Sequence, residues 1–316
     1  MSVLVFAENW EGSFKKSTYE AVSYASALAQ SVGGSATAVV VGNVSADKLA
    51  ELGKYGAAKV IQVDGEANHQ GLASILAQSA AGAKYIVLNG TWKAKGAAPR
   101  LAVKLNASIA TEVVELPSST APFVVKKKVF SGKAFAHVEL NSDVKVIVLS
   151  TNSYGVKENA AAAAIEKSSA AATEKDNSLQ HVEYQKTAGK INLTEAELVV
   201  SAGRGMKDPS NWGMVEQLAE VLGAATACSK PVADIGWRPH HEHVGQTGIA
   251  VAPNLYIAIG ISGAIQHLAG ISSSKKIVVI NTDPEAPFFK AADYGIVGDA
   301  LQVVPKLTEA IKKLKG

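Results

Sequence analysis

The residues best suited to bind a ligand lie in the last third of the chain, where an apolar run leads into a glycine-rich turn. Residues 255–259 are apolar, Gly260 and Gly263 follow, and helical spacing continues to His267. Main-chain amides at the start of such a helix favour an anion such as a phosphate. Ser262 is the expected N-cap. A strand, turn and helix without a ligand is an equally open interpretation, because short glycine motifs recur by chance.

Two further glycine-flanked segments carry side chains that suit a cofactor. Gln246 and Thr247, in the segment VGQTG, offer an amide and a hydroxyl to the edge of a heteroaromatic ring, although a hairpin turn is the plainer interpretation. Arg204 lies between two glycines after an expected strand. Arginine pairs with phosphate oxygens or stacks on planar rings, and the alternative at this position is a surface salt bridge.

The run from Pro239 to His243 contains three histidines and one glutamate, which are residue types that bind metals. Adjacent residues cannot all converge on one ion without a contorted backbone, so the spacing favours a polar loop. Cys228 is the single cysteine, which excludes an intrachain disulfide and a cysteine-cluster metal site. We expect it to be a small buried side chain. The sequence has no GxSxG elbow and no Walker P-loop, so nothing points to hydrolysis or phosphoryl transfer.

These segments need a layered scaffold, and the first third of the chain alternates between strand and helix patterns. Such alternation predicts a parallel sheet with helices on both faces. From about residue 109 consecutive strands predict antiparallel or mixed edge strands, and residues 159–177 predict a partly helical surface excursion. After residue 197 the alternation of strand and helix resumes. The expected strands are 3–6, 38–41, 60–63, 85–88, 113–116, 123–130, 135–139, 144–149, 198–201, 255–260, 276–280 and 294–297, and the expected helices are 17–30, 46–52, 71–79, 211–222, one from residue 262, and 301–314.

Composition sets the broad class of protein. The chain has 316 residues, which suggests two domains, and 47% of them are hydrophobic, which excludes general disorder. With 31 basic against 28 acidic residues the net charge is +3, so non-specific binding of nucleic acid is not expected. The N-terminal segment lacks a signal-peptide pattern, so we expect a cytoplasmic protein, or one in the mitochondrial matrix if a presequence has been removed.

Four blocks of the second half resemble the electron-transfer flavoprotein alpha-subunit family. They are VVSAGRGMKDP at 199–209, VGQTG at 244–248, LYIAIGISGAIQHLAGISSSKKIVVIN at 255–281 and DPEAPFFKAADYGIVGDALQVVP at 283–305. Their order and number make this resemblance specific, whereas the first half resembles the family mainly in length and layout.

The resemblance implies an N-terminal domain over residues 1–188, mostly a parallel sheet with added antiparallel strands, that packs on the partner subunit. It implies a Rossmann-like, doubly wound FAD-binding domain over residues 189–316. Such subunits carry one FAD and pair with a beta subunit that holds AMP or, in bifurcating members that use NADH, a second FAD. They take electrons from acyl-CoA-type dehydrogenases and pass them to a membrane quinone oxidoreductase.

The resemblance also implies the residues that hold FAD. Arg204 and Ser229 would lie near the flavin, and His267 would contact its O2 side. Thr247 would lie within hydrogen-bond range of N5. The implied set is Arg204, Ser229, Lys230, Val244, Gly245, Gln246, Thr247, Ser262, Gly263, Ala264, Ile265, Gln266, His267, Asn281, Asp299 and Ala300.

One departure from the family concerns Lys230, where many members have arginine after the serine. The positive charge is kept, but the planar fork is lost. A cation beside the N1–C2=O edge favours the one-electron-reduced anion of a flavin, so we expect Lys230 to support one-electron chemistry with a shifted potential. A flavin- or nicotinamide-dependent enzyme with its own substrate, and a nucleotide-binding module without redox activity, are the alternatives from other classes.

Overall fold

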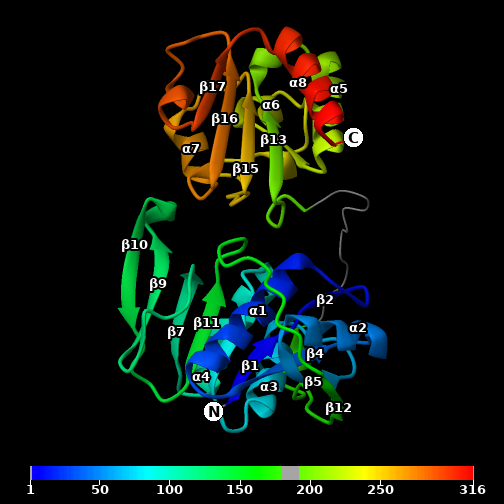
Figure 1. Cartoon of the computed structure of the whole chain (residues 1–316), viewed down its shortest axis with the longest axis vertical. Coiled ribbons are helices and arrows are strands. Elements are labelled where there is room, and N and C mark those ends of the chain that lie inside the picture. The colour runs from blue at the N-terminus through cyan, green and yellow to red at the C-terminus, as the bar shows by residue number, and fades with distance from the viewer. Residues whose placement is uncertain (1, 180–191, 316) are drawn as a thin grey trace. The chain divides into compact units, whose positions relative to one another are not determined.

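The computed structural model describes residues 2–179 and 192–315, which divide into two compact units (Figure 1). The first unit holds residues 2–129 and 134–179, and the second holds residues 130–133 and 192–315. The expected domain boundary between residues 188 and 189 lies outside the described residues. Each unit has its own parallel sheet, as the alternation of strand and helix patterns predicts.

The sheet of the first unit is parallel from β7 to β12 and ends in an antiparallel hairpin. The β-branched runs of the first third form its central strands, which confirms those predictions. A short ribbon of β2 (Asn9–Trp10) and β3 (Ser13–Phe14) lies apart from it. In spatial order the strands are β10 (Ala134–Glu139), β9 (Phe123–Val129), β7 (Ser108–Val113), β11 (Lys145–Leu149), β6 (Ala83–Leu88), β1 (Ser2–Phe6), β4 (Ser35–Val41), β5 (Ala57–Val63) and β12 (Ala164–Ser168), with β8 (Ser119–Thr120) paired to β9.

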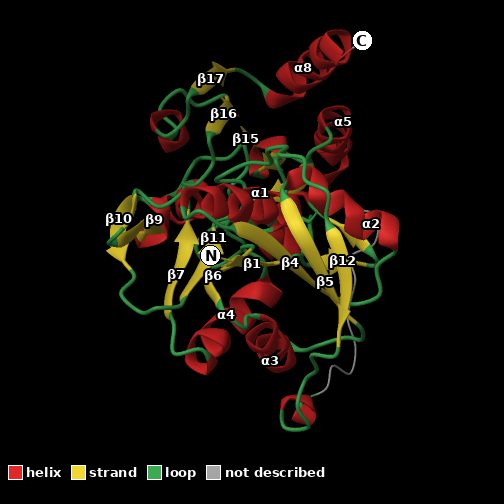
Figure 2. Cartoon of the chain, turned by 60° about the horizontal axis from the view of Figure 1, so that its bottom comes forward, coloured by secondary structure: helices red, strands yellow, loops and turns green. Residues whose placement is uncertain are grey.

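Helices cover both faces of this sheet because its residues alternate between them. On β1, Val3 and Val5 pack toward α1, whereas Leu4 and Phe6 pack toward α3 and α4. Figure 2 shows α1 on one side of the sheet and the other two helices on the opposite side. The helical elements are α1 (Lys16–Ser31), α2 (Ala46–Glu51), η1 (Leu52–Tyr55), α3 (His69–Ser79), α4 (Trp92–Lys104), η2 (Phe130–Gly132, assigned to the second unit) and η3 (Asp176–Ser178).

Three features of the first unit differ from expectation. Helix α4 was not expected, because Pro99 interrupts its pattern; its start is capped by Thr91, whose hydroxyl accepts a hydrogen bond from the Ala94 amide at 3.2 Å. The excursion over residues 159–177 contains an edge strand, β12, which pairs with β5 through its main chain while its side chains stay mostly exposed. The strand expected at residues 113–116 lies earlier, as β7, since it pairs in parallel with β11.

The second unit has a wholly parallel sheet with helices on both faces, as expected for a doubly wound domain. Helices α5, α6 and α8 cover one face, and α7 with η7 covers the other. In spatial order the strands are β14 (Ala225–Cys228), β13 (Leu198–Ala202), β15 (Leu255–Ile259), β16 (Lys276–Asn281) and β17 (Tyr294–Val297). The helical elements are η4 (Arg204–Met206), η5 (Pro209–Trp212), α5 (Gly213–Leu222), α6 (Lys230–Asp234), η6 (His240–Glu242), α7 (Ile265–Ile271), η7 (Pro287–Lys290) and α8 (Ala300–Lys315).

Two elements of this unit could be defined only from the structure. Strand β14 was not expected, because its sequence ATAC lacks a β-branched apolar run. The helix expected at residues 211–222 consists of the 3₁₀ turn η5 followed by α5, which ends at Gly223 in the left-handed conformation, with φ of 72°. The terminal helix is confirmed, and its last turn carries lysines where the helix dipole favours cations. Across the described parts of the chain, no helix combines the length and apolarity needed to cross a bilayer.

A buried carboxylate holds the loop after β11 in the first unit. Glu20 on α1 is 3% exposed. Its Oε1 accepts hydrogen bonds from the amides of Tyr154 and Gly155, each at 2.8 Å, and its Oε2 accepts one from the Asn152 amide at 2.9 Å. The loop reverses at Asn152, whose φ is +59°.

We expect Glu20→Gln to lower the free energy of unfolding by about 1–3 kcal/mol, because one carboxylate oxygen becomes an amide that cannot accept the buried N–H. Chemical denaturation measures the loss. Glu166→Gln is the control, since Glu166 pairs with Lys59 at an exposed position and should change stability by less than about 1 kcal/mol. Equal effects of the two substitutions would contradict the assignment.

Candidate functional site

The residues singled out in the sequence gather at one edge of the second sheet. Parallel strands have their carboxyl ends at a common edge, and Arg204, Ser229, Gly260, Asn281 and Asp299 each lie at or just after such an end. The strand order corresponds to 2-1-3-4-5 along the chain, so the direction of winding reverses between β13 and β15. Open sheets of this order bind ligands in the crevice at that reversal.

The two loops at the reversal touch through their main chains. The Gly203 amide donates to the Ile259 carbonyl at 2.9 Å, and the Gly205 amide donates to the Gly260 carbonyl at 3.1 Å. A Cβ on Gly205 would lie 2.5 Å from the Gly260 Cα, so neither loop has room for a side chain there. The close approach leaves Arg204 exposed at the crevice.

The turn after β15 differs from the expected helix start. The helix α7 begins at Ile265 rather than at Ser262, and Ala264 is its N-cap position. Gly260 and Gly263 both have positive φ, of 59° and 84°, so the chain makes a turn before the helix begins. With seven residues α7 is short, so the amides around Ser262 belong to a glycine turn and not to a helix N-terminus.

The VGQTG segment is a turn that rests on α7. The Gly248 amide donates to the Gly245 carbonyl at 3.1 Å, as in a tight turn, and the Gln246 amide donates to the Gln266 carbonyl at 2.7 Å. A Cβ on Gly270 would lie 2.6 Å from the Gly245 Cα. The hairpin-like interpretation and the ligand-loop interpretation are therefore compatible, because the turn leaves Gln246 and Thr247 exposed.

The start of this loop is tied to β14. The Val244 amide donates to the Cys228 carbonyl at 3.0 Å, and the Ser229 amide donates to the Ala202 carbonyl at 3.1 Å. Burial raises the pKa of the Cys228 thiol to about 12, which fits a small buried side chain rather than a reactive thiol. Lys230, the first residue of α6, is exposed beside the buried Ser229.

The two histidines nearest the loop are buried and electrostatically coupled. His267 is 7% exposed, and burial together with His243 lowers its pKa to about 4, whereas a hydrogen bond with the Val244 main chain raises it. Its Nε2 lies 2.9 Å from the Tyr256 hydroxyl, and its Nδ1 has no hydrogen-bond partner among the described residues. Burial and Lys230 also lower the pKa of His243. A buried polar atom without a partner points to a missing acceptor.

The histidine run before the loop is held by an ion pair. Arg238 donates from Nε and Nη2 to the two carboxylate oxygens of Glu242, at 2.8 and 2.7 Å, and from Nη1 to Glu216 at 3.0 Å. Its guanidinium also lies 5.5 Å from the Trp212 ring centroid. Within residues 2–179 and 192–315, no three His, Cys, Asp or Glu side chains are arranged to hold a metal ion. Glu242 instead anchors the polar loop.

The far end of the edge contains a contact that the sequence reasoning missed. Lys207 donates from Nζ to Asp299 at 2.8 Å, and Asp299 also accepts a hydrogen bond from the Leu301 amide at 3.0 Å at the start of α8. These bonds hold the pKa of Asp299 below its usual range. Lys207 has a φ of 69° and a ψ of −44°, a rare conformation for a side-chain-bearing residue. In the sequence, the position of Lys207 three residues after Arg204 is the feature that could have pointed to it. Asn281 donates to the Ile261 carbonyl at 3.0 Å, and Ala300 is buried as the first residue of α8.

The exposed members of the expected set form a mixed surface at this edge. Ser262, Ala264, Ile265 and Gln266 are exposed on the turn and on α7, and Ile265 has 65% of its surface accessible. Together with Arg204, Lys230, Gln246 and Thr247 they offer cations, amides, hydroxyls and an apolar side chain. A large cofactor that is both planar and anionic matches this combination.

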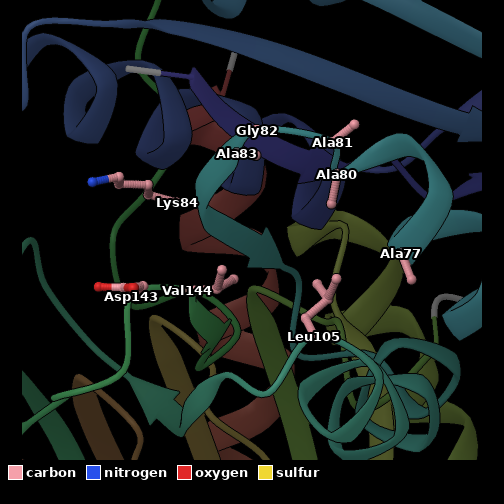
Figure 3. Close-up of a pocket in the computed structure, with 9 residues that line it drawn as sticks. All are labelled: Ala77, Ala80, Ala81, Gly82, Ala83, Lys84, Leu105, Asp143 and Val144. Carbon is pink, nitrogen blue, oxygen red and sulfur yellow. The ribbon is translucent and has the colours of Figure 1, made fainter.

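The first unit contains a pocket at the amino ends of its strands, whereas the candidate site of the second unit lies at carboxyl ends. It has a volume of about 400 Å³ and lies at the amino ends of β6 and β11, between Ala80, Leu105 and Val144. Figure 3 shows the Lys84 and Asp143 side chains extending to the same side, away from Leu105. Its charged lining groups do not converge on a ligand, so we do not assign it as the functional site.

The second unit is a doubly wound α/β domain whose candidate site lies at the carboxyl ends of its strands. Residues 192–272 match the model of the electron transfer flavoprotein FAD-binding domain, and residues 3–173 match that of the electron transfer flavoprotein domain. The chain therefore belongs to the electron transfer flavoprotein alpha-subunit family. Asn281, Asp299 and Ala300 lie beyond the segment matched by the FAD-binding model.

Individual relatives agree with this assignment. The chain is 39% identical over 316 residues to the electron transfer flavoprotein subunit alpha of Syntrophomonas wolfei, with 98% of each chain covered. It is 38% identical over 317 residues to the same subunit of Pseudomonas aeruginosa, covering 98% of this chain and 100% of that one. The mitochondrial subunit of Dictyostelium discoideum is 41% identical over 225 residues, or 69% of this chain and 62% of that one.

We expect Gly260→Ala to abolish cofactor binding at this edge. Gly260 has positive φ, and a Cβ there would lie 2.7 Å from the Gly205 Cα, so the two loops must separate. Gly213→Ala in the same unit is the control, because a Cβ meets nothing within 4 Å at that helix start. Equilibrium dialysis with FAD and thermal unfolding measure both variants. Tight FAD binding by a folded Gly260→Ala variant would contradict the assigned crevice.

Proposed function

We propose that this chain is the FAD-carrying alpha subunit of a heterodimeric electron-transfer flavoprotein. The observation that carries the proposal is the meeting of the expected FAD residues at the glycine-lined reversal of the second sheet. All of them except Asn281, Asp299 and Ala300 lie within the segment that matches the FAD-binding domain. In this role the chain holds one FAD and acts as an electron carrier without substrate chemistry of its own. FAD supplies the redox chemistry when bound, and the chain's residues set its position and electrostatic surroundings.

The proposed roles follow from where the residues lie. Arg204 and the amides of the Ser262–Ala264 turn bind phosphate oxygens, because they combine a cation with main-chain donors. The exposed Gln246 and Thr247 hydrogen-bond the edge of the flavin ring, with the Thr247 hydroxyl toward N5. Ile265 and Gln266 cover the ring and the pyrophosphate segment. Asn281, Asp299 and Ala300 bind the adenosine end.

The interior of the unit supports these contacts. His267 provides a nitrogen toward the O2 side of the flavin, and its Nδ1 has no partner in the described chain. Val244 and Gly245 fix the loop to β14 and α7. Ser229 fixes the position of the Lys230 charge beside the ring. The residues present therefore fit FAD in their donor types and in the main-chain cradle formed by glycine.

The proposal extends to partners. The first unit packs on an electron-transfer flavoprotein beta subunit, which holds AMP or a second FAD. Electrons come from acyl-CoA-type dehydrogenases, as in fatty acid β-oxidation, and pass to a membrane quinone oxidoreductase or respiratory chain. The setting is the bacterial cytoplasm, or the mitochondrial matrix if a presequence is removed. The relative from D. discoideum carries the word mitochondrial in its name.

Reconstitution with the beta subunit tests the proposal. We expect one FAD on the alpha chain, reduction of that FAD by an acyl-CoA dehydrogenase with its substrate, and reoxidation by a quinone reductase. Two results would contradict the carrier assignment: direct oxidation of a small substrate without a dehydrogenase, and a colourless protein that retains ADP or AMP. A second FAD with reduction by NADH would instead identify a bifurcating member of the same family.

Lys230 yields a separate prediction about the potential of the bound flavin. Lys230→Met should lower the midpoint potential by about 59 mV, a tenfold change for one electron, because a cation that favours the reduced anion is lost. Lys230→Arg keeps the charge and should change the yield of one-electron-reduced flavin through its fixed fork. Potentiometric titration measures both, with Lys312→Met on the exposed face of α8 as the control. Unchanged potential and yield in the first two variants would refute this role.

A further inference from the structure

A buried phenol lies directly behind the candidate site and contacts a residue of the expected set. Tyr256 on β15 has no exposed surface, and its hydroxyl lies 2.9 Å from Nε2 of His267. The Phe288 ring stacks on Tyr256 with an interplanar angle of 15° and lies 5.7 Å from the imidazole centroid. The pair is therefore enclosed by aromatic packing and by the buried Ser201 hydroxyl, which also hydrogen-bonds to Tyr256, and it has little freedom to exchange partners with water.

Both members of the pair are neutral at physiological pH. Burial raises the pKa of the Tyr256 phenol well above its ordinary value, against an opposing effect of Ser201. Burial lowers the pKa of His267 to about 4. A neutral imidazole has one donor nitrogen and one acceptor nitrogen, and a phenol has one proton to donate. The 2.9 Å contact can therefore be a hydrogen bond in which the phenol donates and Nε2 accepts, and this requires that Nε2 carries no proton.

We propose that Tyr256 is a positioning residue that donates to Nε2 of His267 and thereby fixes the tautomer in which Nδ1 carries the proton. The proposal rests on the assignment of the FAD site and deepens it. Nδ1 is buried and makes no hydrogen bond of good geometry among the described residues, although the Val244 main chain hydrogen-bonds to the imidazole and raises its pKa. We assign the Nδ1 N–H to an oxygen of the flavin, in addition to that main-chain contact or in its place. Tyr256 itself touches no cofactor and acts only through the imidazole.

The groups around His267 keep it neutral. His243, on the segment before the VGQTG turn, faces it and disfavours a second positive charge, whereas the Val244 main chain acts in the opposite sense. Burial, Lys230 and His240 lower the pKa of His243 itself, and Asp234 raises it. From β15 the partner is the neutral Tyr256, and from η7 it is the apolar Phe288. His267 should therefore present a neutral N–H donor rather than an imidazolium.

Nitrogen NMR of the histidine-labelled heterodimer, loaded with FAD, tests the proposal. The wild type should show a protonated Nδ1 and an unprotonated Nε2 at His267, without titration above about pH 5. Tyr256→Phe keeps the ring and removes only the hydroxyl. It should give a mixture of tautomers, a His267 titration at higher pH, and a changed flavin midpoint potential. Tyr24→Phe removes a buried hydroxyl that lies 3.2 Å from a carbonyl in the first unit, and it should change none of these.

Several outcomes would overturn the proposal. A protonated Nε2 in the wild type would contradict the proposed tautomer. This measurement tests the proposal even if Tyr256→Phe does not fold. An unchanged tautomer and potential in a folded Tyr256→Phe variant would also do so. A protein that takes up no FAD refutes the proposed function instead, and the tautomer of His267 remains measurable in the same sample. If FAD binds without shifting the Nδ1 resonance, the donor role of Nδ1 is wrong.

Discussion

The close approach of two main chains at the carboxyl ends of β13 and β15 is the constraint on which the second unit depends. Gly205 and Gly260 leave no room for a Cβ between them, and hydrogen bonds from Gly203 and Gly205 join the two loops. Because the loops meet through backbone, the amides of Gly203 and Gly205 are used in joining them and the positions of both loops are fixed. The same approach places Arg204 at the surface, while Met206 two residues later is fully buried. A glycine pattern that is weak evidence in a sequence thus becomes specific once its packing partner is known.

Behind this edge, buried polar groups hold the loops from within the unit. Arg238 donates two hydrogen bonds to Glu242, which precedes the VGQTG turn. The Tyr256 hydroxyl contacts the imidazole of His267. Such contacts in a low-dielectric interior are costly to break, since each leaves a buried group without a partner. The buried side chains thus fix the positions of the loops, and the exposed side chains of the edge are available to contact a ligand.

Sequence periodicity predicted the layered fold because parallel strands buried on both faces are continuous apolar runs. It failed where local chemistry departs from that rule. Pro99 interrupts the helical pattern of α4, and the small residues of β14 form no strand pattern. Strand β12 lies at an exposed edge and is held by its main chain, so its side chains carry no apolar pattern. Ser262 was the wrong helix start because two glycines with positive φ extend the turn.

The candidate site shows the same limits. Motif order identified the segments that gather at the sheet edge, and all of them except the VGQTG turn directly follow a strand end. The contacts that hold them are made across the fold and have no local pattern. Examples are the pair of Lys207 with Asp299, 92 residues apart, and the approach of Gly245 to Gly270. These could be found only once the chain was folded.

Hydrogen–deuterium exchange of the heterodimer with and without FAD tests the central claim most directly, because the claim concerns which amides face the cofactor. We predict that FAD slows exchange in the segments after β13 and β15 and in the VGQTG turn, around Gly205, Gln246 and Gly263. The strands of the first unit should be unaffected. FAD-dependent protection confined to the first unit, or absent from these three segments, would contradict the account.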